Sequence, residues 1–326
     1  MTDRFTEPAD VGEEHPDFDD HPGAAELLGL ASAAAPARAL RARVLDAATS
    51  ARRPGRPAVE AEVDEIEEID EIETLRRTLA DIAVLVDSIS AVEATARTIE
   101  GWTVAGLVGH LTAIERYFGS VLGWWNEPAL DHVSDHLAMT RPTVEISESA
   151  DFEDVRSKWH AATAAVVARL SDLEGRLVER VDFHAFDLSI RSLLVARTFE
   201  VWTHDEDIRR ALGHEPAAPD AARLRVMTRT AVAALPLGML LGGRAPSGRS
   251  VRVVLTGDGG GSWVQSLEFG ASPIEVPAPS ATLVTDAMGF CRVAAKRLDP
   301  RDLAYRYRGE ADLIEDVLVA VAVFAA

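Results

Sequence analysis

The feature that most constrains this chain is a series of long amphipathic patterns between residues 74 and 212. Apolar residues recur every three or four positions there, which is the period of a helix with one buried face. The patterns predict helices over about 74–96, 102–125, 152–173 and 188–212. Thr103 is placed to cap the second helix and Gly213 to end the fourth. Residues 126–150 show no steady period and predict a long loop, so we expect an antiparallel four-helix bundle with one long crossover.

The pattern of apolar and polar residues changes after residue 216. A helix is predicted over 221–241 with a break at Pro236, followed by a β-hairpin whose strands are 252–256 and 263–269. The remaining segments predict, in order, a strand, a helix, a strand and a helix: 282–284, 286–298, 304–308 and 311–324. The expected fold class is therefore mostly α, with a small α+β C-terminal domain. We expect a tail and linker, a helical domain and the α+β domain, over 1–59, 60–215 and 216–326.

Acidic residues are concentrated in the first part of the chain. The net charge is −20, and 12 of these negative charges lie within residues 1–73. Because apolar residues are sparse there, residues 1–59 are expected to be disordered or weakly helical. An excess of negative charge disfavours nucleic acid and anionic membrane surfaces as partners. The acidic segment is most simply a solvated face, and a basic protein partner for this tail is the sharper alternative.

Cys291 is the only cysteine, which excludes an intrachain disulfide and a cysteine-based zinc finger. With no base or helix start beside it, Cys291 is expected to be a buried small residue rather than a nucleophile. No segment reaches the roughly 18–20 apolar residues of a spanning helix, and no basic and apolar leader is visible. The expected location is the cytoplasm.

One group of side chains suggests a metal site. Glu200 and His204 are spaced i and i+4, which places both on one face of the fourth predicted helix. His110 lies in the apolar stripe of the second helix, between Leu107 and Ile114, so its ring must enter the bundle. The Glu-x-x-x-His spacing alone is a weak signal. Two imidazoles and one carboxylate inside a bundle, however, are a ligand set suited to zinc with a fourth position open.

Other histidines and carboxylates rank lower. His132 and His136 are also spaced i and i+4, but the predicted loop around them makes solvated residues the better interpretation. His160 is expected to be a structural or surface group. Asp205 or Asp207 could accept a hydrogen bond from a metal-binding histidine, although exposed helix charges are commoner.

Two stretches resemble the mycothiol-dependent maleylpyruvate isomerase family, which belongs to the DinB-like metalloproteins. They are WTVAGLVGHL at residues 102–111 and EVWTHDEDIRRALG at residues 200–213. The resemblance implies a DinB-like four-helix bundle followed by a small α+β domain, over about residues 74–326. It also implies that His110, Glu200 and His204 bind zinc, or another divalent metal, and that Arg292 lies near the substrate. The segment before Thr74 has no counterpart in the family.

The chemistry implied by this resemblance uses mycothiol, a low-molecular-weight thiol. Zinc ionises the thiol, the thiolate adds to the cis double bond of maleylpyruvate, the new single bond rotates, and elimination leaves the trans isomer. Arg292 would pair with a carboxylate of the substrate. Permanent transfer of the thiol to a small electrophile needs the same ligands, so the sequence leaves isomerase and S-transferase open. A water is expected in the fourth position, facing a cavity near Arg292. The alternative is a non-catalytic metal-binding or regulatory protein whose acidic tail binds a partner.

Overall fold

The computed structural model describes residues 66–99, 101–127, 136–183, 186–244, 246–271 and 278–322. The expectations for residues 1–59 and for His132 lie outside these described residues.

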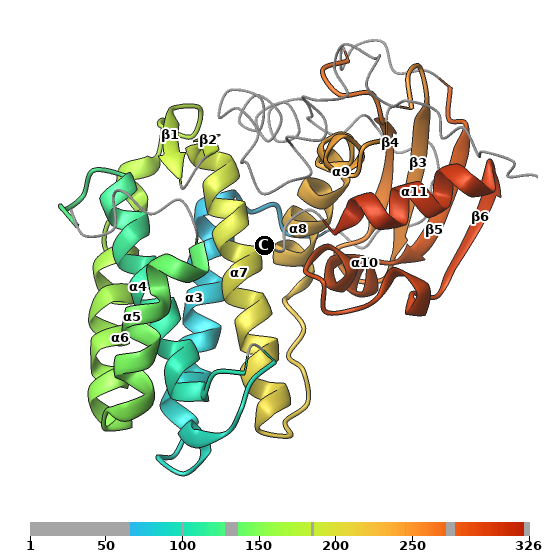
Figure 1. Ribbon diagram of the computed structural model, residues 1–326. Helices are drawn as coiled ribbons and strands as arrows, with labels where there is room; N and C mark the ends of the chain where they lie inside the picture. Colours follow the sequence, from blue (N-terminus) through green and yellow to red (C-terminus); the bar gives the residue numbers. More distant parts are fainter. Residues whose placement is uncertain are drawn as a thin grey trace, which may run out of the picture. The chain divides into compact units, whose positions relative to one another are not determined.

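The first part of the described chain is helical (Figure 1). Helix α3 packs against α7 and α6, and α4 packs against α5, α6 and α7. The helices are α3 (Glu71–Ser88), α4 (Val104–Val121), α5 (His136–Ser149), α6 (Phe152–Val167) and α7 (Ile190–Ala211), with short 3-10 helices at Glu93–Thr95 and Leu170–Leu173. Together with the mixed sheet that follows, this confirms the predicted fold class.

The helix ends agree with the local chemistry of the sequence. The side chain of Thr103 accepts a hydrogen bond from the backbone nitrogen of Gly106, as expected for the cap of α4. Ser189 caps α7 in the same way. Gly213 follows α7 with φ of 71°, a conformation that favours glycine and ends the helix.

The prediction of a loop over 126–150 is wrong, because α5 occupies His136–Ser149. Its pattern is hard to recognise: Pro142 lies inside the helix and few of its side chains are buried. Tight packing against α4 stabilises it instead. A Cβ atom on Gly109 of α4 would come within 2.2 Å of Oγ of Ser147 in α5, so the two helices approach closely because this glycine has no side chain.

Other boundaries also differ from the prediction. The first helix ends at Ser88 rather than near Ala96, and the third ends at Val167. A two-stranded antiparallel hairpin, β1 (Arg180–Phe183) and β2 (Phe186–Ser189), precedes α7 and was not predicted. Its strands have only four residues each, which is too short for an alternating pattern to be recognised.

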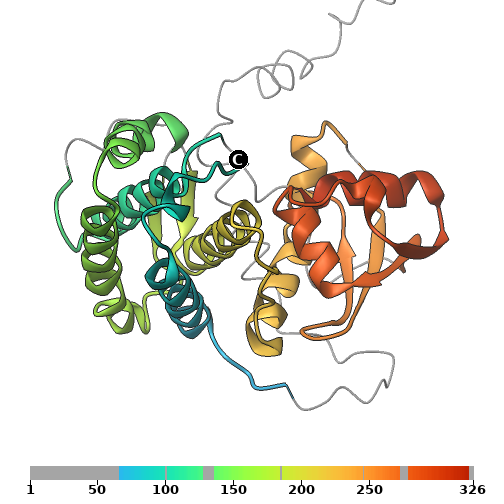
Figure 2. The same ribbon diagram turned by 90° about the horizontal axis from the view of Figure 1, so that it is seen from below.

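The second part of the chain is a four-stranded mixed sheet with helices packed against it (Figure 2). Strands follow the order β4-β3-β5-β6, in which only β3 and β5 are parallel. Helices α8, α10 and α11 contact the sheet. The elements are α8 (Ala221–Ala233), α9 (Leu235–Leu241), β3 (Ser250–Thr256), β4 (Gly261–Ser266), β5 (Ala281–Asp286), α10 (Ala287–Ala294), β6 (Tyr305–Gly309) and α11 (Ala311–Val321), with a 3-10 turn at Pro300–Asp302.

Helix α7 contributes to both hydrophobic cores. Leu193, Val201 and Ile208 belong to the core of the helical part. Phe199 and Trp202, from the other side of the same helix, belong to the core that includes the sheet. Helix α7 therefore packs against both the helical part and the part that contains the sheet.

No single helix within the described ranges is long and apolar enough to cross a membrane. Helices α8 and α9 reach that length and apolarity only as a pair, and the pair is bent by 44°.

Candidate metal centre

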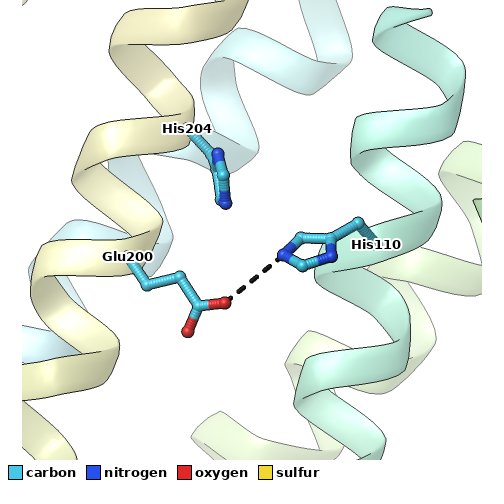
Figure 3. A group of neighbouring side chains, drawn as sticks. All are labelled: His110, Glu200 and His204. Atoms are coloured by element: carbon cyan, nitrogen blue, oxygen red, sulfur yellow. Dashed lines mark ion pairs between the residues drawn. The ribbon is translucent and has the colours of Figure 1, made fainter. Parts of the chain in front are cut away.

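The structure brings together the three residues that the sequence predicts as metal ligands. One ligand atom from each of His110, Glu200 and His204 lies within 4.8 Å of the others. His110 projects from α4, while Glu200 and His204 project from successive turns of α7 toward it (Figure 3). His110 is 1% exposed and His204 is 8% exposed, so this group lies in the interior of the bundle.

Two buried atoms of the group face each other without a satisfied hydrogen bond. Nε2 of His110 lies 3.4 Å from Oε1 of Glu200. Nε2 of His110 has no hydrogen-bond partner among the described residues, whereas Oε1 of Glu200 also lies 2.8 Å from Nε2 of His136. Buried polar atoms are nearly always satisfied. Ligand atoms at 2.0–2.1 Å from a tetrahedral zinc are about 3.4 Å apart, so this spacing fits a bound metal.

The second nitrogen of each histidine is engaged elsewhere. Nδ1 of His110 lies 2.9 Å from Oγ1 of Thr140. Nδ1 of His204 lies 3.2 Å from Oδ2 of Asp207, so Asp207 is the one of the two predicted aspartates that lies beside the ring. Asp205 pairs with Arg209 instead. Such contacts fix the ring and the tautomer of a metal-binding histidine. They leave Nε2 of both rings to bind a metal.

Glu200 is oriented by a buried arginine that sequence analysis did not identify. Arg197 donates to Oε2 of Glu200 and, at 2.6 Å, to Oε1 of Glu115. Arg197 and Glu115 are each 1% exposed. The sequence feature that could have identified Arg197 and Glu115 is a charged residue on a helix face that is otherwise apolar. This arrangement leaves Oε1 of Glu200 directed toward the histidines.

The electrostatic surroundings keep both His110 and Glu200 in the form that binds metal. Burial lowers the pKa of His110 to about 3, although the nearby Glu200 carboxylate opposes this shift. Burial opposes ionisation of Glu200 as well. The guanidinium of Arg197 and the imidazoles of His136 and His110 outweigh burial and hold the pKa of Glu200 well below its usual range. At neutral pH the imidazole of His110 is therefore neutral and the carboxyl of Glu200 is ionised.

The interpretation of His136 as a solvated loop residue is wrong. His136 is the first residue of α5, and its Nε2 lies 2.8 Å from Oε1 of Glu200. Its ring centre is 5.2 Å from that of His110. His160, in contrast, is partly exposed and contacts Asp87 at 2.6 Å, which agrees with its prediction as a structural or surface group. His136 was misplaced because α5 itself was not predicted.

Arg292 does not contact the three candidate ligands. Its Nη2 donates to Glu206 at 2.8 Å, from α10 to a buried carboxylate on α7. Arg297, which was not predicted, makes the corresponding contact with Asp207 at 2.7 Å. A substrate contact by Arg292, a cavity near it and a water in the fourth position stay predictions.

Comparisons with known proteins found similarities to one protein family and to solved structures. Residues 74–209 match the family model of the mycothiol maleylpyruvate isomerase N-terminal domain. Two solved structures of mycothiol-dependent maleylpyruvate isomerase, one of them a histidine-to-alanine mutant, are similar at 14% and 15% identity. Each similarity covers 72% of this chain and 91% of the other, with TM-scores of 0.49 for the mutant and 0.45.

No curated protein shows significant sequence similarity to the chain. The family match includes all of α4 and nearly all of α3 and α7. It therefore includes His110, Glu200 and His204. Residues 74–209 of this chain are therefore similar to mycothiol maleylpyruvate isomerase N-terminal domains.

Proposed function

We propose that the chain is a metal-dependent enzyme that uses a low-molecular-weight thiol, mycothiol, for isomerisation or S-transfer on a small electrophile such as maleylpyruvate. The observation that carries the proposal is the buried Nε2 of His110, which has no hydrogen-bond partner among the described residues and faces Oε1 of Glu200 at 3.4 Å, with His204 beside them. Zinc, or another divalent metal, bound by these residues would lower the pKa of a coordinated thiol so that the thiolate forms at neutral pH.

The buried charges favour an anionic ligand at this centre. Burial raises the pKa of Glu115, and its ion pair with Arg197 opposes that shift; with Glu115 and Glu200 both ionised, the two carboxylates and the Arg197 guanidinium carry a net charge of −1. A divalent cation would change this local net charge from −1 to +1. An anion in the open position would then bring it to zero, which reduces the cost of burying the whole group. A thiolate satisfies this requirement.

The protein's own residues would supply position rather than covalent chemistry. Thr140 and Asp207 orient the two rings, and Arg197 orients the carboxylate of Glu200. For a dicarboxylate substrate such as maleylpyruvate, we retain Arg292 as the candidate cation. Its contacts with Glu206 use Nε and Nη2, and its side chain is 31% exposed. Nη1 is the guanidinium nitrogen that those contacts do not use.

The test is an assay of the purified full chain, loaded with zinc, with mycothiol and a panel of electrophiles that includes maleylpyruvate. Isomerisation consumes maleylpyruvate and regenerates the thiol, whereas S-transfer consumes the thiol. The S-transfer product has the summed mass of both reactants for an addition, or that sum less the leaving group and a proton for a displacement. His110→Ala should abolish either reaction, and His160→Ala, at a surface histidine, should leave it unchanged. Stoichiometric metal without any thiol-dependent reaction would instead support a non-catalytic metal-binding protein.

A further inference from the structure

Two neighbouring carboxylates on α7 are each bound by an arginine from the segment that follows β5. Glu206 pairs with Arg292, and Asp207 pairs with Arg297. Both carboxylates are 1% exposed. Nε and Nη2 of Arg297 each lie 2.7 Å from one oxygen of Asp207, so this pair is bidentate. The two pairs are similar in chemistry and in the elements they join.

Only one of the two pairs reaches a candidate metal ligand. Oδ2 of Asp207, which accepts from Arg297, also lies 3.2 Å from Nδ1 of His204. Glu206 lies about 200° around the helix from His204, at 100° per residue, so its contact with Arg292 faces away from the ligand ring. The side chain of Arg297 is also the more buried, at 10% exposed against 31% for Arg292.

The backbone after α10 holds Arg297 in place. Lys296 has φ of 52°, and within the described ranges it is the one residue other than glycine with a positive φ. This turn directs the backbone nitrogen of Arg297 to the carbonyl oxygen of Arg292, 2.8 Å away. Nη1 of Arg297 also lies 3.3 Å from the carbonyl oxygen of Ala295. These backbone contacts help to hold the guanidinium in the orientation in which it pairs with Asp207.

We propose that Arg297 is a positioning residue for the metal centre and acts through Asp207 on the ring of His204. The inference rests on the metal site of the proposed function and not on its thiol chemistry. Fixing the ring with Nε2 toward the centre raises metal affinity, because less freedom is lost when the metal binds. Because such coupling is reciprocal, bound metal also strengthens the contact between α7 and the segment that carries Arg297.

The experiment measures the affinity of the full chain for Zn²⁺ and Co²⁺ by competition with a chelator. Arg297→Ala should weaken binding about 10- to 100-fold, and Arg292→Ala, which removes the matched ion pair, should weaken it less than about 3-fold. Arg297→Lys should restore part of the loss. The visible spectrum of bound Co²⁺ should change in Arg297→Ala and not in Arg292→Ala, because it reports the ligand geometry.

Equal effects of Arg297→Ala and Arg292→Ala on metal affinity would overturn the inference, as would no effect of Arg297→Ala. Thermal unfolding identifies a variant that fails to fold. If Arg297→Ala fails to fold, the metal affinities of Asp207→Asn and Arg297→Lys are compared with that of Arg292→Ala instead. A wild-type chain that binds no metal would overturn this inference and the proposed function together. A chain that binds metal but does not react with thiols would overturn the proposed function alone.

Discussion

Nε2 of His136 lies 2.8 Å from Oε1 of Glu200, the same oxygen that faces His110. The helix that carries His136 also carries Thr140, whose hydroxyl contacts Nδ1 of His110. Helix α5 thus contributes two side chains to the surroundings of the candidate metal centre. His136 is not part of the group whose ligand atoms all lie within 4.8 Å of one another, which consists of His110, Glu200 and His204.

We therefore expect His136→Ala to retain one metal ion per chain under conditions in which Glu200→Ala loses it. The three residues of the compact group remain in His136→Ala, whereas Glu200→Ala removes the only carboxylate among them. Metal analysis after dialysis against a weak chelator measures the difference. Loss of metal from His136→Ala would identify His136 as a fourth ligand, and a centre closed by four side chains would favour a structural role over catalysis.

The sequence was sufficient to predict that the three candidate ligands face one another, because each lies on a long helix with a clear period. The inward position of His110 follows from its apolar neighbours on α4, and the spacing of Glu200 and His204 follows from the geometry of a single helix. Helix α5 could not be predicted in this way, because Pro142 lies inside it and few of its side chains are apolar and buried. Consequently the positions of His136 and Thr140 were not predictable either.

The choice between Arg292 and Arg297 illustrates a second limit. Both residues follow β5 in sequence, and both reach α7. Which carboxylate each one meets depends on how the segment after α10 turns at Lys296 and packs against α7. Contacts of this kind are set by tertiary packing, and a periodic pattern carries no information about them.

Gly109→Ala should destabilise the protein and weaken metal binding. The added Cβ would lie 2.2 Å from Oγ and 2.6 Å from Cβ of Ser147, so α5 must shift. Overpacking of this kind costs about 1–3 kcal/mol, and the shift would move Thr140 away from His110. Chemical unfolding and chelator competition measure the two effects.

Gly106→Ala is the matched control for that experiment. It lies on the same helix, but the nearest atoms to its added Cβ are the side chain of Glu148, at 2.9 Å, and a methyl group of Val144, at 3.2 Å. The Glu148 side chain can move, and alanine favours a helix over glycine by about 1 kcal/mol. Gly106→Ala should therefore be nearly neutral. Similar losses in both variants would argue against a specific close approach at Gly109.

Arg197→Met should destabilise the metal-free protein by about 3–5 kcal/mol, because it leaves the carboxylates of Glu115 and Glu200 buried without their common partner. Adding Glu115→Gln should recover part of this loss by removing one of the two charges. Arg301→Met provides the contrast. Arg301 is 89% exposed in its pair with Asp299, and exposed ion pairs contribute little to stability. Urea unfolding of the wild type, the two single variants and the double variant measures these stabilities. Equal stabilities of Arg197→Met and Arg301→Met would contradict the prediction.

Cys291 should be unreactive in the folded protein. It is 0% exposed, in the core that includes the sheet. Burial, together with the carboxylates of Asp286 and Glu206, raises the pKa of its thiol far above the usual value. A thiol reagent at pH 8 should modify the chain only after denaturant is added, and then with one equivalent. Rapid modification of the native protein would show an accessible nucleophile and contradict this assignment.

The same burial gives Cys291 a predictable effect on stability at high pH. In the folded protein the thiol stays protonated, whereas in the unfolded chain it ionises above about pH 8.5. Ionisation stabilises only the unfolded state, so the free energy of unfolding should fall as pH rises, by up to about 1.4 kcal/mol per pH unit from this group. Cys291→Ala removes the thiol and should lack this part of the decline. The test compares the unfolding free energies of the two proteins at pH 8 and pH 10. Parallel declines would mean that the thiol of Cys291 ionises as readily in the folded state as in the unfolded chain, which its complete burial does not allow.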